Sequence, residues 1–420
     1  MIEKRKKRDF LDERMRKRDV NCIFSQENLD LLFDSIHNST NLHDLFDMIS
    51  DCLESSKCVI KYEHFHYVLS ILQIKEFANH IDELLNIICI VTTYRKSKFL
   101  ALYTDEFIPI IMNFVPNSLT FSIFGNLVSI SKRFAQKLGD FGINNVILEN
   151  IQINSDVTTE VFHLVRKLLE AQYDCSFAFD TIIGFCIDAN NNKINDGLRT
   201  LRKYVKTHKS RFLELFHTPL FGYLFDLCYT NSKYLKRYLD FLSEMVCEIE
   251  EFGLMLMKSE IFVTMLSIEQ YEEHYVLYNE IAENNKNKDY MVEIGIVDIC
   301  LKELHNGRNF NVNQQVVVLI SQLIDSTDDG LLYDILSHGF VEMATSIFSS
   351  LDNHNQQIMV EAFEDIERRG EIQNNNHFIE SILCNDNLIQ ELIMLSENPD
   401  AEEALVYECK ALISRALYNK

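Results

Sequence analysis

Apolar side chains recur along this 420-residue chain at the spacing of an amphipathic α-helix. In the segment GFVEMATSIF, residues 339–348, the apolar positions after the glycine fall at i, i+3, i+4, i+7 and i+8. The segment GINNVILENI, residues 142–151, repeats this pattern after its own glycine. Only four prolines and twelve glycines interrupt such segments in the whole chain. The pattern therefore predicts an all-α protein.

The two segments also share what precedes them. Each follows an apolar helix, a short polar loop and a brief second helix, in FSIFGNLVSISKRFAQKLGDFG (121–142) and in VVVLISQLIDSTDDGLLYDILSHG (316–339). Aligning such units along the chain gives intervals of 40, 41, 37, 40, 35, 43 and 43 residues. The corresponding helix positions are Asn86, Asn126, Lys167, Tyr204, Glu244, Asn279, Gln322 and Asp365.

A period near 40 residues, with one short helix and two longer ones, is typical of armadillo and HEAT solenoids. Each repeat in such an array buries its apolar faces only against its neighbours, so we expect one elongated superhelix with a long inner groove. HEAT repeats in place of armadillo repeats, and a generic helical domain with chance internal similarity, remain alternatives. The repeats override the two or three globular domains that length alone would suggest.

Charge is distributed unevenly along the chain. The net charge is −23, yet residues 1–20 contain nine basic and five acidic side chains, which leaves 58 acidic against 31 basic residues in the other 400. Such a body repels nucleic acid and anionic membranes and attracts cationic polypeptides. We therefore expect no nucleic-acid partner and no membrane partner.

Cysteine usage and hydropathy indicate an intracellular protein. The eleven cysteines are odd in number and form no C-x-x-C pair, which favours reduced thiols in the cytosol or nucleus. No N-terminal apolar signal region is present, and no run of about 18 uncharged apolar residues occurs. We therefore expect neither secretion nor a membrane span.

Catalytic and metal-binding motifs are absent from the sequence. It contains no P-loop, no H-E-x-x-H, no G-x-S-x-G and no paired Cys and His at zinc spacing. The densest histidine cluster, HFH at 64–66, falls within an apolar helical segment, where packing or surface exposure is the simpler explanation. We expect no enzymatic activity, no cofactor and no metal.

Taken in order along the chain, these segments resemble the importin alpha family. The segment IEKRKKRDFLDERMRKRDV is similar to the second half of that family's importin-beta-binding segment. HNSTNLHDLFDMISDCLESS resembles its first repeat, FSIFGNLVSISKRFAQKLGDFG its third, and residues 316–415, including FEDIERRGE, its last three. The resemblance covers nearly the whole chain. It implies a right-handed armadillo-repeat superhelical solenoid of about ten repeats over residues 26–418, with a flexible basic arm over residues 1–21.

The resemblance also implies a function. Members of the family are nuclear import adaptors of the cytoplasm and nucleus, which bind basic nuclear localisation signals and couple to importin beta through the arm. The basic residues of the arm are Lys4, Arg5, Lys6, Lys7, Arg8, Arg14, Arg16, Lys17 and Arg18. The segment RKRD, residues 16–19, would compete with cargo for the adaptor's own groove, and the acidic segment SENPDAEE (396–403) could serve an export receptor for recycling. The family's arm is about twice as long, so affinity for importin beta is expected to be reduced; a solvated charged tail is the alternative.

Cargo capture in the family uses a tryptophan and an asparagine at i and i+4 of each groove helix, which share one helix face. The indole contacts a lysine stem, and the amide holds the cargo backbone. This chain contains no tryptophan. At the family's major site the asparagines correspond to Asn86 and Asn126, whereas Lys167 occupies the third position. The tryptophan positions are occupied by Asp82, Ser122 and His163.

This chain resembles the family more closely at the minor site than at the major site. Tyr275 stands at a tryptophan position, Asn279 at the asparagine position, and Glu272 one turn before Tyr275. In the next repeat Gln322 retains an amide, whereas Val318 has no ring. The alternatives are solvent-facing or capping asparagines and a tyrosine packed between helices. An armadillo scaffold for protein–protein interaction with no transport role is the alternative function, and the loss of every tryptophan favours it.

Overall fold

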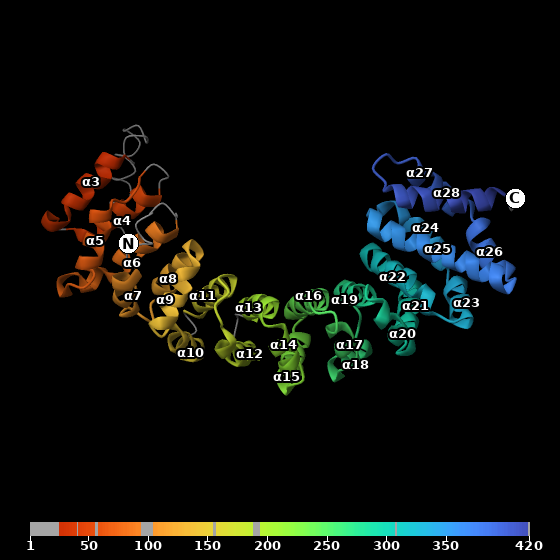
Figure 1. Ribbon diagram of the computed structural model, residues 1–420, viewed down its shortest axis with the longest axis horizontal. Coiled ribbons are helices and arrows are strands. Elements are labelled where there is room, and N and C mark those ends of the chain that lie inside the picture. Colours follow the sequence, from red (N-terminus) through yellow and green to blue (C-terminus); the bar gives the residue numbers. More distant parts are fainter. Residues whose placement is uncertain are drawn as a thin grey trace, which may run out of the picture. The chain divides into compact units, whose positions relative to one another are not determined.

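The computed structural model describes residues 25–39, 41–54, 58–93, 104–153, 157–187, 194–306 and 309–418. These residues form α-helices and short 3₁₀ turns and contain no strand, so the predicted all-α repeat fold is confirmed (Figure 1). The chain divides into two compact units, residues 1–224 and 225–420.

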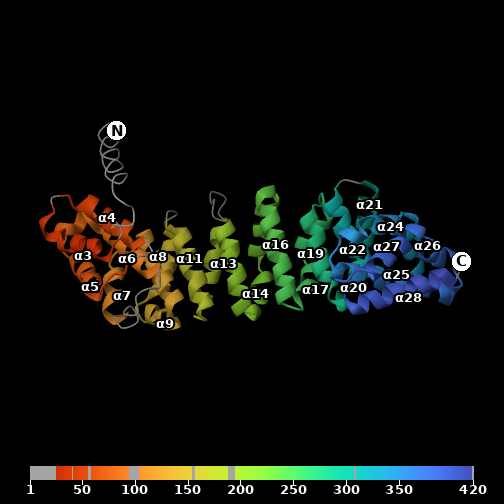
Figure 2. The same cartoon turned by 90° about the horizontal axis from the view of Figure 1, so that it is seen from above.

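The first unit is organised around a row of helices that pack each against the next (Figure 2). We call this row the first ladder. Its members are α4 (Leu42–Glu54), α6 (Ile81–Thr93), α8 (Ser118–Ile130), α11 (Thr158–Glu170) and α13 (Ile194–Thr207). The helices that pack against the ladder or cap it are α3 (Gln26–Asp34), α5 (Tyr62–Ile71), α7 (Thr104–Met112), α9 (Lys132–Asp140), α10 (Ile143–Ile153), α12 (Phe179–Ile187) and α14 (Lys209–Phe216). The 3₁₀ turns are η1 (Ile36–Asn38), η2 (Lys75–His80) and η4 (Ser176–Ala178), and α15 (Pro219–Tyr229) includes the boundary between the units.

The second unit repeats this plan. Its ladder, the second ladder, consists of α16 (Ser232–Glu248), α19 (Glu272–Ala282), α22 (Phe310–Leu323), α25 (Asn353–Gln373) and α28 (Glu403–Tyr418), again with each helix packed on the next. The other helices are α17 (Phe252–Met257), α18 (Glu260–Ser267), α20 (Asn285–Glu293), α21 (Ile296–Asn306), α23 (Asp329–Ser337), α24 (Phe340–Ile347), α26 (Asn376–Leu383) and α27 (Asp386–Ser396). Two 3₁₀ turns, η5 (Ile324–Ser326) and η6 (Phe348–Ser350), follow α22 and α24.

The predicted repeat is confirmed most clearly in the second unit. The triplets α20–α21–α22, α23–α24–α25 and α26–α27–α28 each combine two helices of 8–11 residues with a longer ladder helix. All eight positions aligned from the sequence, from Asn86 to Asp365, lie on ladder helices. The sequence period of about 40 residues is therefore the spacing between successive ladder helices.

A glycine with positive φ opens the second helix of three repeats. Gly142, Gly295 and Gly339 have φ of +83°, +81° and +78° and precede α10, α21 and α24. A side chain is strained in this left-handed region, and glycine is not. The two glycines that stood out in the sequence, Gly142 and Gly339, therefore mark the turn between the first and second helices of a repeat.

Ladder helices such as α6, α8 and α11, which have a ladder neighbour on each side, are buried on most of their circumference, which leaves one narrow polar stripe. On α8, for example, Phe121, Phe124 and Leu127 are fully buried, whereas Ser122 and Asn126 are partly exposed. A helix flanked on both sides by neighbours must be apolar on both flanks, so only positions spaced by about one turn reach solvent. These stripes are the places where a ladder can contact a ligand.

Candidate functional site

The nine basic residues of the predicted arm lie outside the described residues: Lys4, Arg5, Lys6, Lys7, Arg8, Arg14, Arg16, Lys17 and Arg18. Their predicted roles in binding importin beta or in occupying the groove stay predictions.

The two asparagines of the predicted major groove lie on the first ladder, where their amides already contact the preceding ladder helix. Asn126 on α8 donates to the Thr93 hydroxyl of α6 at 2.9 Å and to that of Thr92 at 3.2 Å. Asn86 on α6 donates to the Ser50 hydroxyl of α4 at 3.4 Å. A peptide backbone would have to compete with these hydrogen bonds for the same amide donors.

No aromatic wall accompanies these amides. Asp82 is exposed and accepts a hydrogen bond from Asn117 at 2.7 Å. Burial lowers the pKa of His163, and the nearby Arg166 and Lys167 lower it further, so this imidazole is neutral at physiological pH. The first ladder therefore presents a carboxylate and a hydroxyl beside its two asparagines, where a stacking site would need a ring face, and the imidazole of His163 lies on the next ladder helix.

The residues of the predicted minor groove lie on α19 and α22, which are adjacent in the second ladder. Tyr275 is fully buried and packs edge-on against Tyr278, with 6.0 Å between ring centroids. Its ring therefore offers no face to a ligand. Asn279 donates from its amide nitrogen to the Gln315 carbonyl and side-chain oxygens at 3.1 and 2.9 Å. Glu272 accepts from Asn311 at 3.5 Å, at the start of α19.

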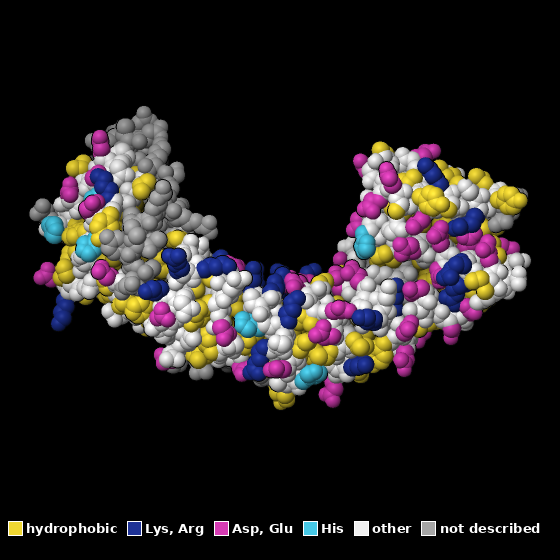
Figure 3. Space-filling view, viewed as in Figure 1, with side chains coloured by type: hydrophobic (Ala, Val, Ile, Leu, Met, Phe, Trp, Pro, Cys, Tyr) yellow, Lys and Arg dark blue, Asp and Glu magenta, His cyan; other side chains and the backbone are white. Residues whose placement is uncertain are grey.

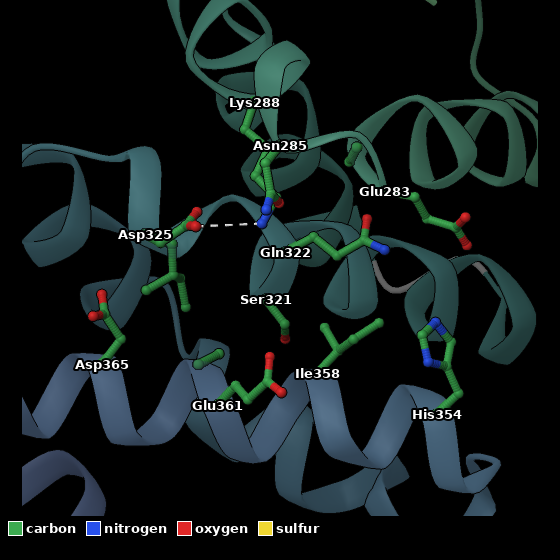
Figure 4. A pocket seen from close by; sticks show the side chains of 13 residues that line it. Glu283, Asn285, Lys288, Ser321, Gln322, Asp325, His354, Ile358, Glu361 and Asp365 are labelled. Atoms are coloured by element: carbon green, nitrogen blue, oxygen red, sulfur yellow. Dashed lines mark hydrogen bonds and ion pairs between the residues drawn. The ribbon is translucent and has the colours of Figure 1, made fainter. Parts of the chain in front are cut away.

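Gln322 is the predicted site residue that opens into a cavity. This cavity has a volume of about 450 Å³ and lies between α19, α20, α22 and α25, inside the second unit. Figure 4 shows Gln322 projecting into the space between α20 and α25. Only 8% of Gln322 is exposed, and its side-chain oxygen is buried without a hydrogen-bond partner among the described residues. A buried acceptor in this state favours a ligand that donates a hydrogen bond.

The carboxylates of Glu283, Glu361 and Asp365 line the same cavity as Gln322. We call the group formed by Glu283, Gln322, Glu361 and Asp365 the acidic pocket. Burial raises the pKa of Glu283, and the neighbouring Glu280 raises it further, against a smaller opposing effect of His354. A cation placed here would favour the ionised form of Glu283 and relieve the repulsion between the two glutamates.

Lys288 lines the same cavity, Arg368 lies on α25, and each of these cations contacts one carboxylate. Lys288 pairs with Asp325 at 3.3 Å, which Figure 4 marks with a dashed line. Arg368 pairs with Asp365 one turn away on α25. Neither Glu283 nor Glu361 has an ion pair among the described residues, so the pocket retains uncompensated negative charge. This arrangement suits a guanidinium or ammonium group, which brings several donors and a positive charge.

The charge of the second unit supports the same preference. Residues 225–420 contain 35 acidic and 13 basic side chains, a net charge of −22, so this unit carries almost all of the net charge of −23 of the chain. Figure 3 shows acidic side chains widely distributed over α19–α28. A potential of this sign concentrates cationic ligands near the surface and accelerates their association.

The sequence predicted Gln322 but not its acidic neighbours. Glu361 and Asp365 are four positions apart on α25, so they share one face of that helix. This spacing was a detectable signal, because Asp365 had already been placed on a ladder helix. Glu283, at the C-terminal end of α19, could not be placed beside them without the structure.

No group of three or more His, Cys, Asp and Glu residues that could hold a metal ion occurs in the part of the chain that the structure describes. Within the same residues, no helix is long and apolar enough to cross a membrane.

Comparison with known proteins identifies the fold of this chain through solved structures and identifies no relative through its sequence. No protein-family model and no curated protein matches this chain. An engineered protein of known structure is 13% identical, with a TM-score of 0.57 over 93% of this chain and 98% of that protein. Importin beta is 7% identical, with a TM-score of 0.53 over 93% of this chain; this chain spans 55% of the importin beta structure.

A structure from work on the interaction between cadherin and β-catenin is 10% identical, with a TM-score of 0.53 over 94% of this chain and 85% of that chain. Identities this low show a shared fold and nothing finer. The chain is an all-α helical-repeat solenoid of the armadillo and HEAT type.

Proposed function

We propose that this chain is a non-enzymatic scaffold that binds a cationic segment of a partner protein on its second ladder. The acidic pocket carries this proposal, because the buried Gln322 amide oxygen has no hydrogen-bond partner among the described residues, and the same cavity is lined by Glu283 and Glu361, neither of which has an ion pair there. An arginine or lysine side chain supplies the missing donor and the missing charge at the same time. The net charge of −22 on the second unit adds long-range attraction for the same ligand.

The finer proposal is that the scaffold is a nuclear import adaptor of the cytoplasm and nucleus. In this role the second ladder binds basic nuclear localisation signals, and the basic arm of residues 1–21 binds importin beta. The order of arm and repeats supports it, as does the similarity of residues 3–20 to an importin-beta-binding segment. An export receptor for recycling is a further proposed partner.

A scaffold with no transport role is the second candidate. The observation that favours it is the state of the stacking positions: the chain has no tryptophan, and the Tyr275 ring that could have replaced one is fully buried. The second candidate keeps the acidic pocket and its cationic ligand and differs only in the role of the arm.

The two candidates separate in one binding experiment. Full-length chain and a variant with Arg16, Lys17 and Arg18 changed to alanine are used to capture purified importin beta. The adaptor proposal expects capture by the wild type and a clear loss with the variant. Equal capture by both, or capture by neither, contradicts the adaptor proposal and favours the scaffold with no transport role.

The acidic pocket is tested with a fluorescent peptide rich in arginine and lysine. The variant Glu361→Gln with Asp365→Asn removes two charges from the pocket, and the control Glu380→Gln with Glu397→Gln removes two exposed charges from the same unit. We expect Kd to rise about tenfold for the pocket variant, which corresponds to about 1.4 kcal/mol, and less than about twofold for the control. Equal loss in both variants would mean that net charge alone attracts the peptide.

A further inference from the structure

Positive charge on the first ladder is confined to two neighbouring helices. Helices α4, α6 and α8 contain no lysine or arginine, whereas α11 and α13 together contain six against three acidic residues. In a chain with 63 acidic and 40 basic residues, this segregation runs against the overall composition. Figure 3 shows Lys and Arg side chains gathered over α11 and α13.

Four of these cations form one surface, which we call the cationic patch: Arg166, Lys167, Arg199 and Lys203. Lys167 of α11 and Lys203 of α13 both pair with the Glu170 carboxylate, at 2.9 and 3.3 Å. Arg199 and Lys203 are one turn apart on α13. The patch therefore bridges two packed ladder helices.

Arg166 is held in place by hydrogen bonds and forms only a long ion pair. Its side chain is 18% exposed, and one guanidinium nitrogen donates to the Thr200 hydroxyl at 3.1 Å and to the Asp196 carbonyl at 3.3 Å. The Asp196 carboxylate lies 3.9 Å away. Burial lowers the pKa of Arg166; Asp196 raises it more than Arg199 lowers it, and Glu170 raises it slightly. An anion beside Arg166 and Arg199 would offset their mutual repulsion.

We propose that the cationic patch docks an acidic, Asp- and Glu-rich segment of a partner protein. Glu170 already shows how the patch binds a carboxylate, because its side chain pairs with two lysines of the patch. Burial would raise the pKa of Glu170, but Lys167 and Lys203 hold it below its ordinary value. Arg166 and Arg199 form a second position where a carboxylate can bind between two cations, and no closely paired carboxylate of the described residues occupies it.

Size and surroundings favour a peptide over a nucleic acid. A duplex presents one phosphate charge about every 1.7 Å along its axis and needs a long basic track. The patch covers two helices, and beyond α11 the ladder continues with the uncharged α8 and then with the acidic α6 and α4. A short acidic peptide can place two carboxylates on the patch without extending over those neighbours. This ligand has the opposite charge to the one proposed for the second ladder, so the inference does not rest on that function.

The proposal is tested by anisotropy of a fluorescein-labelled peptide of alternating Glu and Ser, titrated with full-length chain at low salt. The variant Arg199→Gln with Lys203→Gln removes two exposed cations of the patch. The control Lys132→Gln with Arg133→Gln makes the same charge change on α9, also in the first unit. We expect a rise in Kd of about fivefold for the patch variant and almost no change for the control. The variant Arg199→Lys with Lys203→Arg should retain binding, and binding should weaken as salt increases.

Three results would overturn the proposal. Equal losses in patch variant and control would show only nonspecific attraction. A labelled oligonucleotide of the same charge that binds the patch at least as tightly as the peptide would make the ligand a nucleic acid. Light scattering that shows self-association of the wild type, lost in the patch variant, would make the occupant the acidic surface of a second copy.

Discussion

The C-terminal ladder helix α28 should be released when Arg415 is removed. Arg415 pairs with Glu364 and Glu367 of α25, at 2.9 Å in each case. The Glu367 side chain is only 4% exposed, and one of its oxygens has no hydrogen-bond partner among the described residues. In the variant Arg415→Met the alkyl packing is retained, but the Glu367 charge is left buried without its cation.

Removing one partner of a fully buried pair costs about 3–5 kcal/mol. Arg415 is 41% exposed, so water reaches the pair from one side and the penalty is smaller. We expect a loss of about 2 kcal/mol in the free energy that holds α28 on α25, equivalent to about 30-fold faster opening. Burial raises the pKa of Glu367, while Arg415 lowers it. Loss of Arg415 therefore raises this folded-state pKa further, and the variant regains stability as pH falls through it.

The assay is hydrogen exchange of residues 403–418 in the wild type, in Arg415→Met and in the double variant Arg415→Met with Glu367→Gln. Exchange of α28 should be faster in the single variant, most strongly at neutral pH, and should return toward the wild-type rate in the double variant. Lys410→Met on the same helix is the matched control, because Lys410 is exposed and has no ion pair in the described residues. Exchange that is unchanged in Arg415→Met, or equally fast in the control, would refute the argument from the buried charge.

Three further predictions concern single sites. Gly370→Ala should destabilise the chain by about 1–3 kcal/mol, because the new Cβ would lie 2.8 Å from a side chain of α26 and 3.1 Å from its backbone. The control Gly222→Ala, whose Cβ would have no atom within 4 Å, should be neutral or slightly stabilising. Thermal melts of the two variants beside the wild type measure both effects. Burial and a hydrogen bond to Glu280 raise the pKa of Cys247 to about 12, so alkylation near pH 8 should be slow and Glu280→Gln should accelerate it, as mass spectrometry would show. Burial lowers the pKa of His274 to about 4, so stability should fall by about 2 kcal/mol between pH 7 and pH 5 and His274→Phe should lack this loss, as urea titrations would show.

The repeat architecture could be predicted because it depends on local signals that recur. Apolar spacing marked the helices, and Gly142 and Gly339 marked turns that require positive φ. Since each repeat packs mainly on its neighbours, one period of about 40 residues was enough to place every aligned position on a ladder helix. The division of the chain between residues 224 and 225 has no such signal, because it falls inside one continuous apolar helix, α15, and not in a polar linker.

The candidate site was less predictable because exposure on a ladder helix depends on both flanking helices. Asn279 and Gln322 occupy corresponding positions in successive repeats, yet the Asn279 amide contacts Gln315 and Gln322 opens into a cavity. Sequence spacing gives the face on which a residue lies and does not give how closely the neighbouring helices approach it. The amide of Asn126 illustrates the same limit, since its contact with Thr93 becomes visible only when α6 and α8 are placed together.

The loss of tryptophan changes how a ladder of this kind can hold a peptide. An indole wall buries the methylene stem of a lysine, and this contribution survives high salt. The acidic pocket has no such wall, since Tyr275 is buried and the pocket carboxylates act through charge. Charge contacts near a surface are screened over about 8 Å at physiological ionic strength. Affinity of the second ladder for a cationic peptide must therefore fall steeply with salt, whereas a ladder that relied on stacking would show a shallow dependence. The slope of that dependence measures which of the two chemistries the chain uses.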